Sequence, residues 1–237
     1  MKTILETRGL KKYFGGLHAI DGVDFRVEAG ELRCLIGPNG AGKSSLFKLI
    51  IGTYEPSQGR IIFKDEDITR LQPYRRVQNG ISMKFQVPGV FRELSSEENL
   101  RVALHRAYQG DELTERVESL LDLLGLQSHR RHLAGNLSHG QQQWLEIGMA
   151  LGVNPSILLL DEPTAGMSVE ETYKTGELVK RLNADRMTVV IIEHDMTFIR
   201  QIASKVTVLH FGKIFVEGTL DEIMRNEDVV RIYLGKA

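Results

Sequence analysis

The chain has 237 residues, which is enough for one large domain or for a domain with a sizeable insertion. Hydrophobic residues make up 42% and charged residues 26%, and the net charge of −1 gives no basic field that would attract a nucleic acid. The single cysteine excludes an internal disulfide framework, and no apolar stretch approaches the roughly 20 residues that span a bilayer. We therefore expect no nucleic-acid partner, and any link to a membrane must run through a partner protein.

The first part of the chain alternates short apolar runs with turns. We expect strands over residues 22–27 and 59–63, because turn-like segments follow the first run and precede the second. These strands are predicted to form an antiparallel layer beside a further apolar strand at 32–36. A helix is expected from Lys43 until Gly52, so the order in this region is strand, glycine-rich loop, helix.

The loop between that strand and helix carries the strongest chemical signal. Its sequence, GPNGAGKS, fits the pattern G-x-x-x-x-G-K-S, in which glycines let backbone N–H groups point at phosphate oxygens. Lys43 can reach the β- and γ-phosphates, and the Ser44 hydroxyl can ligate Mg²⁺. The positive end of the following helix also faces the anion. The expected nucleotide-binding residues here are Gly37, Pro38, Asn39, Gly40, Ala41, Gly42, Lys43, Ser44 and Ser45.

The middle of the chain changes to a helical period. Ser95 and Glu98 form a capping-box pair, and leucines then recur on one helical face until Gly125, a plausible helix stop. We therefore expect a single domain over 1–237, with a core of 1–92 and 152–237 and a helical subdomain of about 93–151.

The last part of the chain returns to buried strands. Continuous apolar runs at 157–160 and 188–192 flank a helical segment at 169–183. This order predicts a parallel sheet that is covered on both faces. Residues 205–210 and 212–218 are expected to form a closing hairpin.

Two carboxylates follow the first of these strands. Asp161 should lie at the carboxyl edge of the sheet beside the phosphate loop, where it can hold Mg²⁺ directly or through a water. Glu162 is next in the chain and can polarise an attacking water as a general base. Two surface acids at a strand end are common in isolation, but beside a matching phosphate loop the catalytic interpretation is favoured.

Residues 137–141, with the sequence LSHGQ, resemble the signature LSGGQ of the ATP-binding subunits of ABC transporters. The resemblance implies that Ser138, Gly140 and Gln141 contact ATP held by an opposite subunit, again at the N-terminus of a helix. His139 departs from the consensus glycine. A tolerated variant is the simpler interpretation, and an added contact or pH dependence is the alternative.

Other positions follow the order of the same family. Phe14 resembles the aromatic residue that stacks on adenine, with Tyr13 as the competing candidate and core packing as the alternative for both. Gln86 resembles the glutamine that senses Mg²⁺ and water, and His194 the histidine that contacts the γ-phosphate. Residues 165–168 resemble the loop that crosses the dimer interface. The resemblance thus implies the catalytic residues Glu162, His194 and Gln86 and the Mg²⁺ ligands Ser44, Gln86 and Asp161.

The resemblance covers essentially the whole chain and implies its fold and activity. The implied fold is α/β, a P-loop (RecA-like) nucleotide-binding core with an antiparallel β layer and a helical insertion. The implied activity is hydrolysis of ATP, with Mg²⁺, to drive solute import through separate membrane permease subunits. In the family, the neighbourhood of 87–91 helps to form the groove that receives a cytoplasmic helix of the permease.

A closer resemblance points to the branched-chain amino acid and urea uptake branch, with the urea-type subunits nearest. It rests on residues 14–17, 143–149, 165–168 and 232–235. The implied partners are permease subunits, a second ATPase subunit that is a related chain or a second copy, and indirectly a solute-binding protein. The implied location is the cytoplasmic face of the cell membrane. The alternative is a soluble ABC-type ATPase without a transport role, although the 118 positions from Lys43 to Asp161 leave no room for a long coiled coil.

Overall fold

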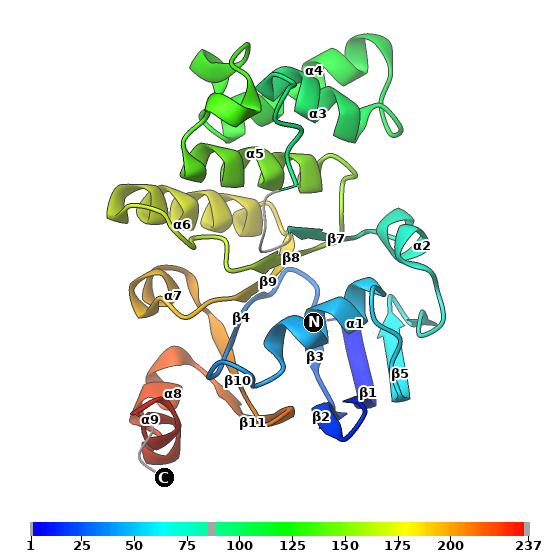
Figure 1. Ribbon diagram of the computed structural model, residues 1–237, viewed down its shortest axis with the longest axis vertical. Helices are drawn as coiled ribbons and strands as arrows, with labels where there is room; N and C mark the ends of the chain where they lie inside the picture. Colours follow the sequence, from blue (N-terminus) through cyan, green and yellow to red (C-terminus); the bar gives the residue numbers. More distant parts are fainter. Residues whose placement is uncertain (1, 85–88, 235–237) are drawn as a thin grey trace.

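The computed structural model describes residues 2–84 and 89–234, and it consists of two β-sheets with helices on their faces (Figure 1). The core sheet has the strand order β11-β10-β4-β9-β8-β7, and neighbouring strands are parallel except for the antiparallel pair β10–β11. Its strands are β4 (Leu32–Ile36), β7 (Ile81–Lys84), β8 (Ile157–Asp161), β9 (Thr188–Ile192), β10 (Lys205–His210) and β11 (Lys213–Gly218). The predicted parallel sheet and closing hairpin are confirmed.

Strand β4 is buried on both faces, which explains its largely apolar sequence; its one charged residue, Arg33, is buried in ion pairs with Glu31 and Glu217. Its Cys34 and Ile36 pack in the hydrophobic cluster on the helical side of the sheet, whereas Leu35 packs in a second cluster on the other side. Burial raises the pKa of the Cys34 thiol to about 12, so this cysteine is an unreactive core residue.

The second sheet is antiparallel, with the strand order β2-β1-β5-β6 and with β3 paired to β1. Its strands are β1 (Thr3–Phe14), β2 (Leu17–Val23), β3 (Arg26–Glu28), β5 (Gln58–Phe63) and β6 (Glu66–Asp67). The predicted single strand over 22–27 is wrong, because the chain leaves the sheet at Asp24 and Phe25. Side chains hold this break: Gly9 N donates to Asp24 Oδ1 (2.6 Å) and Phe25 N donates to Thr7 Oγ1 (2.9 Å).

Helix α1 (Lys43–Ile51) lies between the two sheets. Its apolar residues share one cluster with Leu5 of β1 and Leu35 of β4. It ends at Gly52, as predicted, and Gly52 has a left-handed conformation. The short helix α2 (Pro73–Gln78), which the sequence did not suggest, supports this end of α1, since the buried Arg76 guanidinium donates to the last carbonyls of α1.

The remaining helices cover the other face of the core sheet. Helices α3 (Ser96–Leu104), α4 (Gly110–Leu123) and α5 (His139–Leu151) lie together at the top of Figure 1, with the short 3₁₀ turns η1 (Gln127–His129) and η2 (Ala134–Asn136) between α4 and α5. The predicted capping box of Ser95 and Glu98 opens α3. The boundaries of the helical subdomain stay a prediction.

The C-terminal part of the chain adds four further helical segments along the described residues. They are α6 (Val169–Ala184), α7 (Met196–Ile202), α8 (Leu220–Arg225) and α9 (Glu227–Leu234). Helix α6 extends one residue beyond the predicted segment. Within residues 2–84 and 89–234, no helix combines the length and apolar character that a membrane crossing requires.

Candidate nucleotide-binding site

The phosphate loop joins β4 to α1 and packs too tightly for side chains at two glycines. A Cβ added at Gly37 (φ 150°) would lie only 2.1 Å from Leu209 O, and a Cβ added at Gly42 (φ 105°) would lie 2.4 Å from Ala19 O. Both backbone conformations also favour glycine over other residues. The two glycines therefore fix the path of the loop, which turns the helix N-terminus toward its interior.

The Lys43 side chain folds back against the phosphate loop. Its Nζ donates to Gly37 O (2.7 Å) and Pro38 O (3.1 Å), and the side chain is nearly buried. Burial lowers the pKa of Lys43, while the nearby Glu162 and Asp161 carboxylates act against that shift. The result is a cation held by neutral carbonyl groups, which an anionic phosphate would satisfy better.

The loop lines a cavity of about 950 Å³, together with Phe14, Glu162 and His194. This volume suits a ligand of nucleotide size. Phe14 is partly exposed and makes an edge contact with Tyr54, whereas Tyr13 packs on His18 (ring centroids 4.3 Å) and is not among the cavity-lining residues. Of the two aromatic candidates, the geometry thus places Phe14 at the cavity.

Asp161 and Ser44 meet at the carboxyl edge of the core sheet. Ser44 Oγ lies 3.4 Å from Asp161 Oδ1, although 117 positions separate the two in the chain. Burial raises the pKa of Asp161, and the hydrogen bond from Ser44 acts in the opposite direction. A hydroxyl and a carboxylate oxygen are ligands that Mg²⁺ accepts, so the residues at this point fit that ion.

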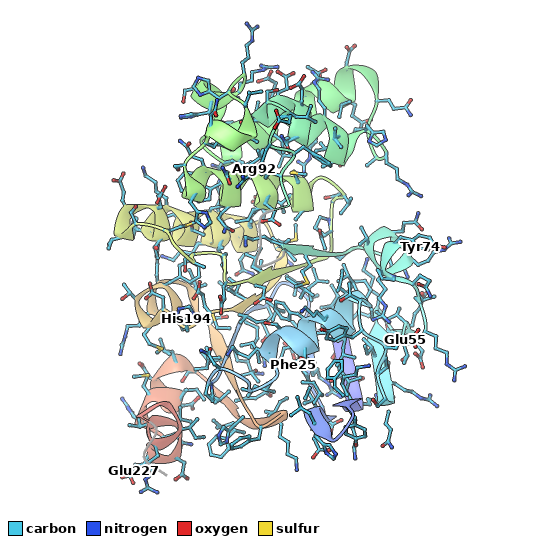
Figure 2. All side chains as sticks on the ribbon, in the orientation of Figure 1. Phe25, Glu55, Tyr74, Arg92, His194 and Glu227 are labelled. Carbon is cyan, nitrogen blue, oxygen red and sulfur yellow. The ribbon has the colours of Figure 1, made fainter. Side chains whose placement is uncertain are left out.

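Glu162 and His194 follow the ends of the neighbouring strands β8 and β9, and their side chains face each other. His194 Nδ1 lies 3.8 Å from Glu162 Oε1, and the exposed His194 ring is labelled in Figure 2 beside the start of α7. Glu162 adopts a left-handed backbone (φ 48°), and its N–H donates to Ile192 O at 2.9 Å. This unusual backbone conformation is held by the neighbouring strand, as strained backbones at functional positions often are.

A buried carboxylate behind this pair was not singled out from the sequence. Glu193 is 1% exposed and accepts hydrogen bonds from Thr164 N (3.2 Å), His194 N (2.8 Å) and Asp195 N (3.3 Å), and a further one from Thr164 Oγ1. It therefore ties the segment after Glu162 to the segment that carries His194. An acid directly after a buried strand is the same signal that pointed to Asp161, and it could have identified Glu193.

The predicted signature residues lie at the start of α5, away from this cavity. Ser138 caps the helix by accepting from Gln141 N (3.2 Å), and its hydroxyl donates to Glu171 Oε1 (3.1 Å). A Cβ at Gly140 would lie 2.5 Å from the same carboxylate oxygen, so a larger residue there would have to displace the Glu171 side chain. None of these residues lines the cavity of the phosphate loop, and Figure 1 places α5 in the upper layer and α1 in the lower half.

His139 makes a specific contact in the same region. Its Nε2 lies 2.9 Å from Ala165 O, and a Cβ at Gly166 would lie 3.2 Å from the ring. The same Nε2 lies 3.1 Å from the Gln143 side-chain nitrogen, so its role as donor to Ala165 O or acceptor from Gln143 depends on the tautomer. His139 therefore joins the signature helix to residues 165–168 of its own chain.

Gln86 lies outside the described residues, and so do residues 85, 87 and 88. The positions on either side of that segment contact one carboxylate: Lys84 Nζ lies 3.8 Å from Glu146 Oε2, and Gly89 N donates to Glu146 Oε1 at 3.2 Å. Both Lys84 and Glu146 are buried, and burial lowers the pKa of Lys84 while Glu146 raises it. The pair was not predicted, because it joins a strand end to a helix more than 60 positions later.

Comparison with known proteins identifies the family. A model of the ABC transporter family matches residues 20–165, more than half of the chain. The chain belongs to this family. Its members hydrolyse ATP to drive transport, and the predicted recognition and activity class are confirmed.

This ABC ATPase resembles several curated proteins over nearly its whole length. The high-affinity branched-chain amino acid transport ATP-binding protein LivG of Escherichia coli K12 is 36% identical, with 99% of this chain and 98% of that protein covered. The protein of the same description, BraF, from Pseudomonas aeruginosa is 35% identical over 100% and 99%. The methionine import ATP-binding protein MetN of Leifsonia xyli is 37% identical over 95% of this chain and 68% of that protein.

Solved ABC cassettes confirm the predicted fold class. A nucleotide-free ATP-binding cassette from an ABC transporter matches with a TM-score of 0.89 at 32% identity, covering 99% and 100% of the two chains. The ADP conformation of the cassette MJ1267 also matches with a TM-score of 0.89, at 33% identity over 100% of both chains. The family thus binds a nucleotide, whereas the roles of single residues in this ABC ATPase stay predictions.

Proposed function

We propose that this chain is the ATP-hydrolysing subunit of an importer that moves branched-chain amino acids or urea through separate permease subunits. The observation that carries the ATPase part is the convergence of the phosphate loop, Phe14, Glu162 and His194 on one cavity, with Asp161 against Ser44. The importer part is supported by the curated relatives, which are described as transport or import ATP-binding proteins. This support favours import over a soluble ATPase without a transport role.

In the proposed reaction, each residue acts at a defined part of ATP. Lys43 leaves its carbonyl partners to pair with the β- and γ-phosphates, and Ser44 and Asp161 hold Mg²⁺, which neutralises phosphate charge when bound. Glu162 accepts a proton from the attacking water. His194, 3.8 Å from Glu162, orients groups at the γ-phosphate.

The proposed assembly contains two ATPase subunits and the permease at the cytoplasmic face of the membrane. Ser138, Gly140 and Gln141 lie outside the chain's own cavity, so we assign them to the ATP of the opposite subunit. That subunit is a related chain or a second copy. A solute-binding protein would act through the permease and would not touch this chain.

A complementation experiment tests the function and separates the two solutes. The gene is deleted in its own organism, and uptake of labelled leucine and labelled urea is measured before and after complementation with wild type or with Lys43→Ala. Wild type should restore uptake of one solute, and Lys43→Ala should not, because the triphosphate loses its main cationic partner. Leucine or urea as the restored solute decides between the two classes. Unchanged uptake of both solutes in the deletion strain would contradict the import role and favour the non-transport alternative.

A further inference from the structure

Phe211, in the turn between β10 and β11, is an unusually exposed aromatic residue. Phe211 is 77% exposed, and Leu17, the first residue of β2, is 66% exposed. Both line the cavity that contains the phosphate loop. Single exposed apolar residues are ordinary, but two from distant parts of the chain at the rim of one cavity indicate an apolar ligand surface.

The backbone of Phe211 is held in a conformation that an aromatic residue seldom adopts. Its φ is 45°, in the left-handed region that favours glycine. The turn is fixed on both sides: Gly212 N donates to Ala41 O of the phosphate loop (2.9 Å), and Asp21 N donates to Gly212 O (2.8 Å). Glycine at position 211 would suit this backbone better, so the ring is kept against a local cost, and such a cost points to a function.

The chemistry of the cavity changes from one part to another. The phosphate loop supplies N–H groups and Lys43, whereas Phe14, Leu17, Ala19 and Phe211 supply an apolar surface. ATP has the same division, with a charged triphosphate and a flat base that gains from contact with aromatic rings. We propose that Phe211 is a second base-contacting residue, which packs on the nucleoside part of ATP and acts together with Phe14. The proposal rests on the proposed function, in that the cavity must hold ATP.

A direct consequence is that Phe211 contributes to affinity through the base and leaves the phosphate contacts unchanged. Phe211→Gly removes the ring and relieves the backbone, so the melting temperature should not fall. The affinity for ATP should fall by about 3- to 10-fold, the range expected for one lost aromatic contact. The affinity for inorganic tripolyphosphate, which has no base, should stay within about 2-fold of wild type.

Phe215→Ala is the matched control. Phe215 lies on β11 and is partly exposed. Like Phe211, it contacts the His210 ring (ring centroids 6.1 Å), but it is not among the residues that line the cavity. It should bind ATP like wild type. The measurements are isothermal titrations of the full chain with ATP and with tripolyphosphate, and thermal melts of each variant.

Several outcomes would overturn the proposal. One is wild-type ATP affinity in Phe211→Gly. Another is an equal loss of affinity for ATP and tripolyphosphate, which would mean that the turn acts through the phosphate loop. A third is normal ATP affinity with loss of ATP-dependent self-association, which would make Phe211 a subunit contact. Failure of the proposed function is distinguishable, because then wild type itself would bind neither ATP nor tripolyphosphate, or Lys43→Ala would bind both as wild type does.

Discussion

Glu193 is a buried carboxylate that holds together the two loops of the proposed catalytic site. It accepts hydrogen bonds from the backbone N–H groups of Thr164, His194 and Asp195, and these residues belong to two separate loops. The segment from Glu162 to Thr164 and the segment of His194 are therefore fixed relative to each other through it. We regard Glu193 as a positioning residue for Glu162.

Replacing Glu193 by Gln should separate turnover from nucleotide binding. The amide turns N–H groups toward N–H donors, which should cost about 1–3 kcal/mol of the free energy of unfolding. The displacement of Glu162 should lower turnover by about 10- to 100-fold, because small misplacements of catalytic groups are costly. The affinity for ATP should change little, since the phosphate loop does not contact Glu193 through any described hydrogen bond.

The control is Glu217→Gln. Glu217 also accepts from buried partners, Arg33 and Thr207, but it lies on β11 and is not among the cavity-lining residues. ATPase assays, ATP titrations and chemical denaturation of both variants give the comparison. If Glu193→Gln loses no more turnover than Glu217→Gln, the positioning role is wrong.

At the residue scale, the sequence predicted what is local and missed what is long-range. The phosphate loop and the acids after Ile157–Leu160 follow from contiguous patterns, and the structure brings them together as expected. Phe211 could not be predicted, because its position at the cavity depends on the hydrogen bond of Gly212 to Ala41, 171 positions away. Glu146 and Lys84 were missed for the same reason.

Among the elements, the start of α5 and the loop before α6 are joined through His139. The His139 imidazole contacts Ala165 O, in a loop whose turn bonds run from Ala165 N to Glu162 O (3.2 Å) and from Met167 N to Thr164 O (3.1 Å). A glycine at position 139 could not make this contact. The histidine thus adds a link between the two elements that the consensus signature lacks.

His139→Ala should loosen the loop without unfolding the protein. Loss of one hydrogen bond of ordinary strength, about 0.5–1.5 kcal/mol, should speed amide exchange of residues 165–167 by about 2- to 10-fold. Hydrogen exchange with mass spectrometry measures this effect. His105→Ala is the control, because His105 bonds to Val102 O within its own helix region. Equal exchange of 165–167 in wild type and His139→Ala would contradict the link.

The segment after residue 88 combines a fixed backbone with an exposed ring. Phe91 N donates to Asn99 Oδ1 (2.7 Å) and Asn99 Nδ2 donates to Phe91 O (3.0 Å), while the Phe91 side chain is 49% exposed. The ring therefore does not fill the core. A held backbone with an outward aromatic residue is suited to contact with another protein, in line with a permease-docking role.

Phe91→Asp should uncouple transport from ATP hydrolysis. A desolvated charge in place of an aromatic contact should lower uptake by the reconstituted transporter at least about 10-fold. The ATPase activity of the isolated chain and its melting temperature should change little, since the side chain is half exposed. Tyr74→Asp, on α2 at the right of Figure 2, is a control of similar exposure. Equal loss of both activities, or of neither, would count against docking.

At the element scale, the apolar patterns predicted five strands of the core sheet almost to the residue, whereas the edge strand β7 was not predicted. β8 and β9 are apolar over nearly their whole length because both of their faces are buried, whereas β4 and β10 include the buried polar residues Arg33 and Thr207. The long strand β1 was not predicted, since charged residues interrupt the alternation of apolar and polar residues and its partner β5 lies far along the chain. The break between β2 and β3 depends on side-chain hydrogen bonds that no propensity records.

In the proposed dimer, the whole molecule supplies one half of each nucleotide site. The phosphate loop and Glu162 line one cavity, while the signature residues lie in another layer, with Ser138 bonded to Glu171 of its own chain. Burial of Glu171 opposes its ionisation, but hydrogen bonds from Ser168 and Ser138 prevail and lower the pKa of Glu171. ATP bound by a second subunit would have to compete with this carboxylate for the Ser138 hydroxyl. In the proposed dimer, bound ATP would draw Ser138 away from Glu171, and a step that removes ATP should favour opening of the subunits.

Glu162→Gln should trap the closed state. The substitution removes the group that accepts the proton of the attacking water, and loss of a general base typically lowers turnover by about 10²- to 10⁴-fold. ATP binding should survive, because Lys43, Ser44 and Asp161 are unchanged. Unhydrolysed ATP should then hold two subunits together, and the mass measured by light scattering after size exclusion should double only when ATP is present.

The trapped dimer has an internal control and two contrary outcomes. Adding Lys43→Ala to Glu162→Gln should abolish the dimer, because the ATP that joins the subunits is no longer held. If the natural partner is a related chain, the same test is made with that chain, and the mixed dimer should be the stronger one. Near-normal turnover in Glu162→Gln would remove Glu162 from the catalytic step. Loss of turnover without a dimer, even with the partner chain present, would contradict a site shared between two subunits and leave each ATP enclosed by one chain.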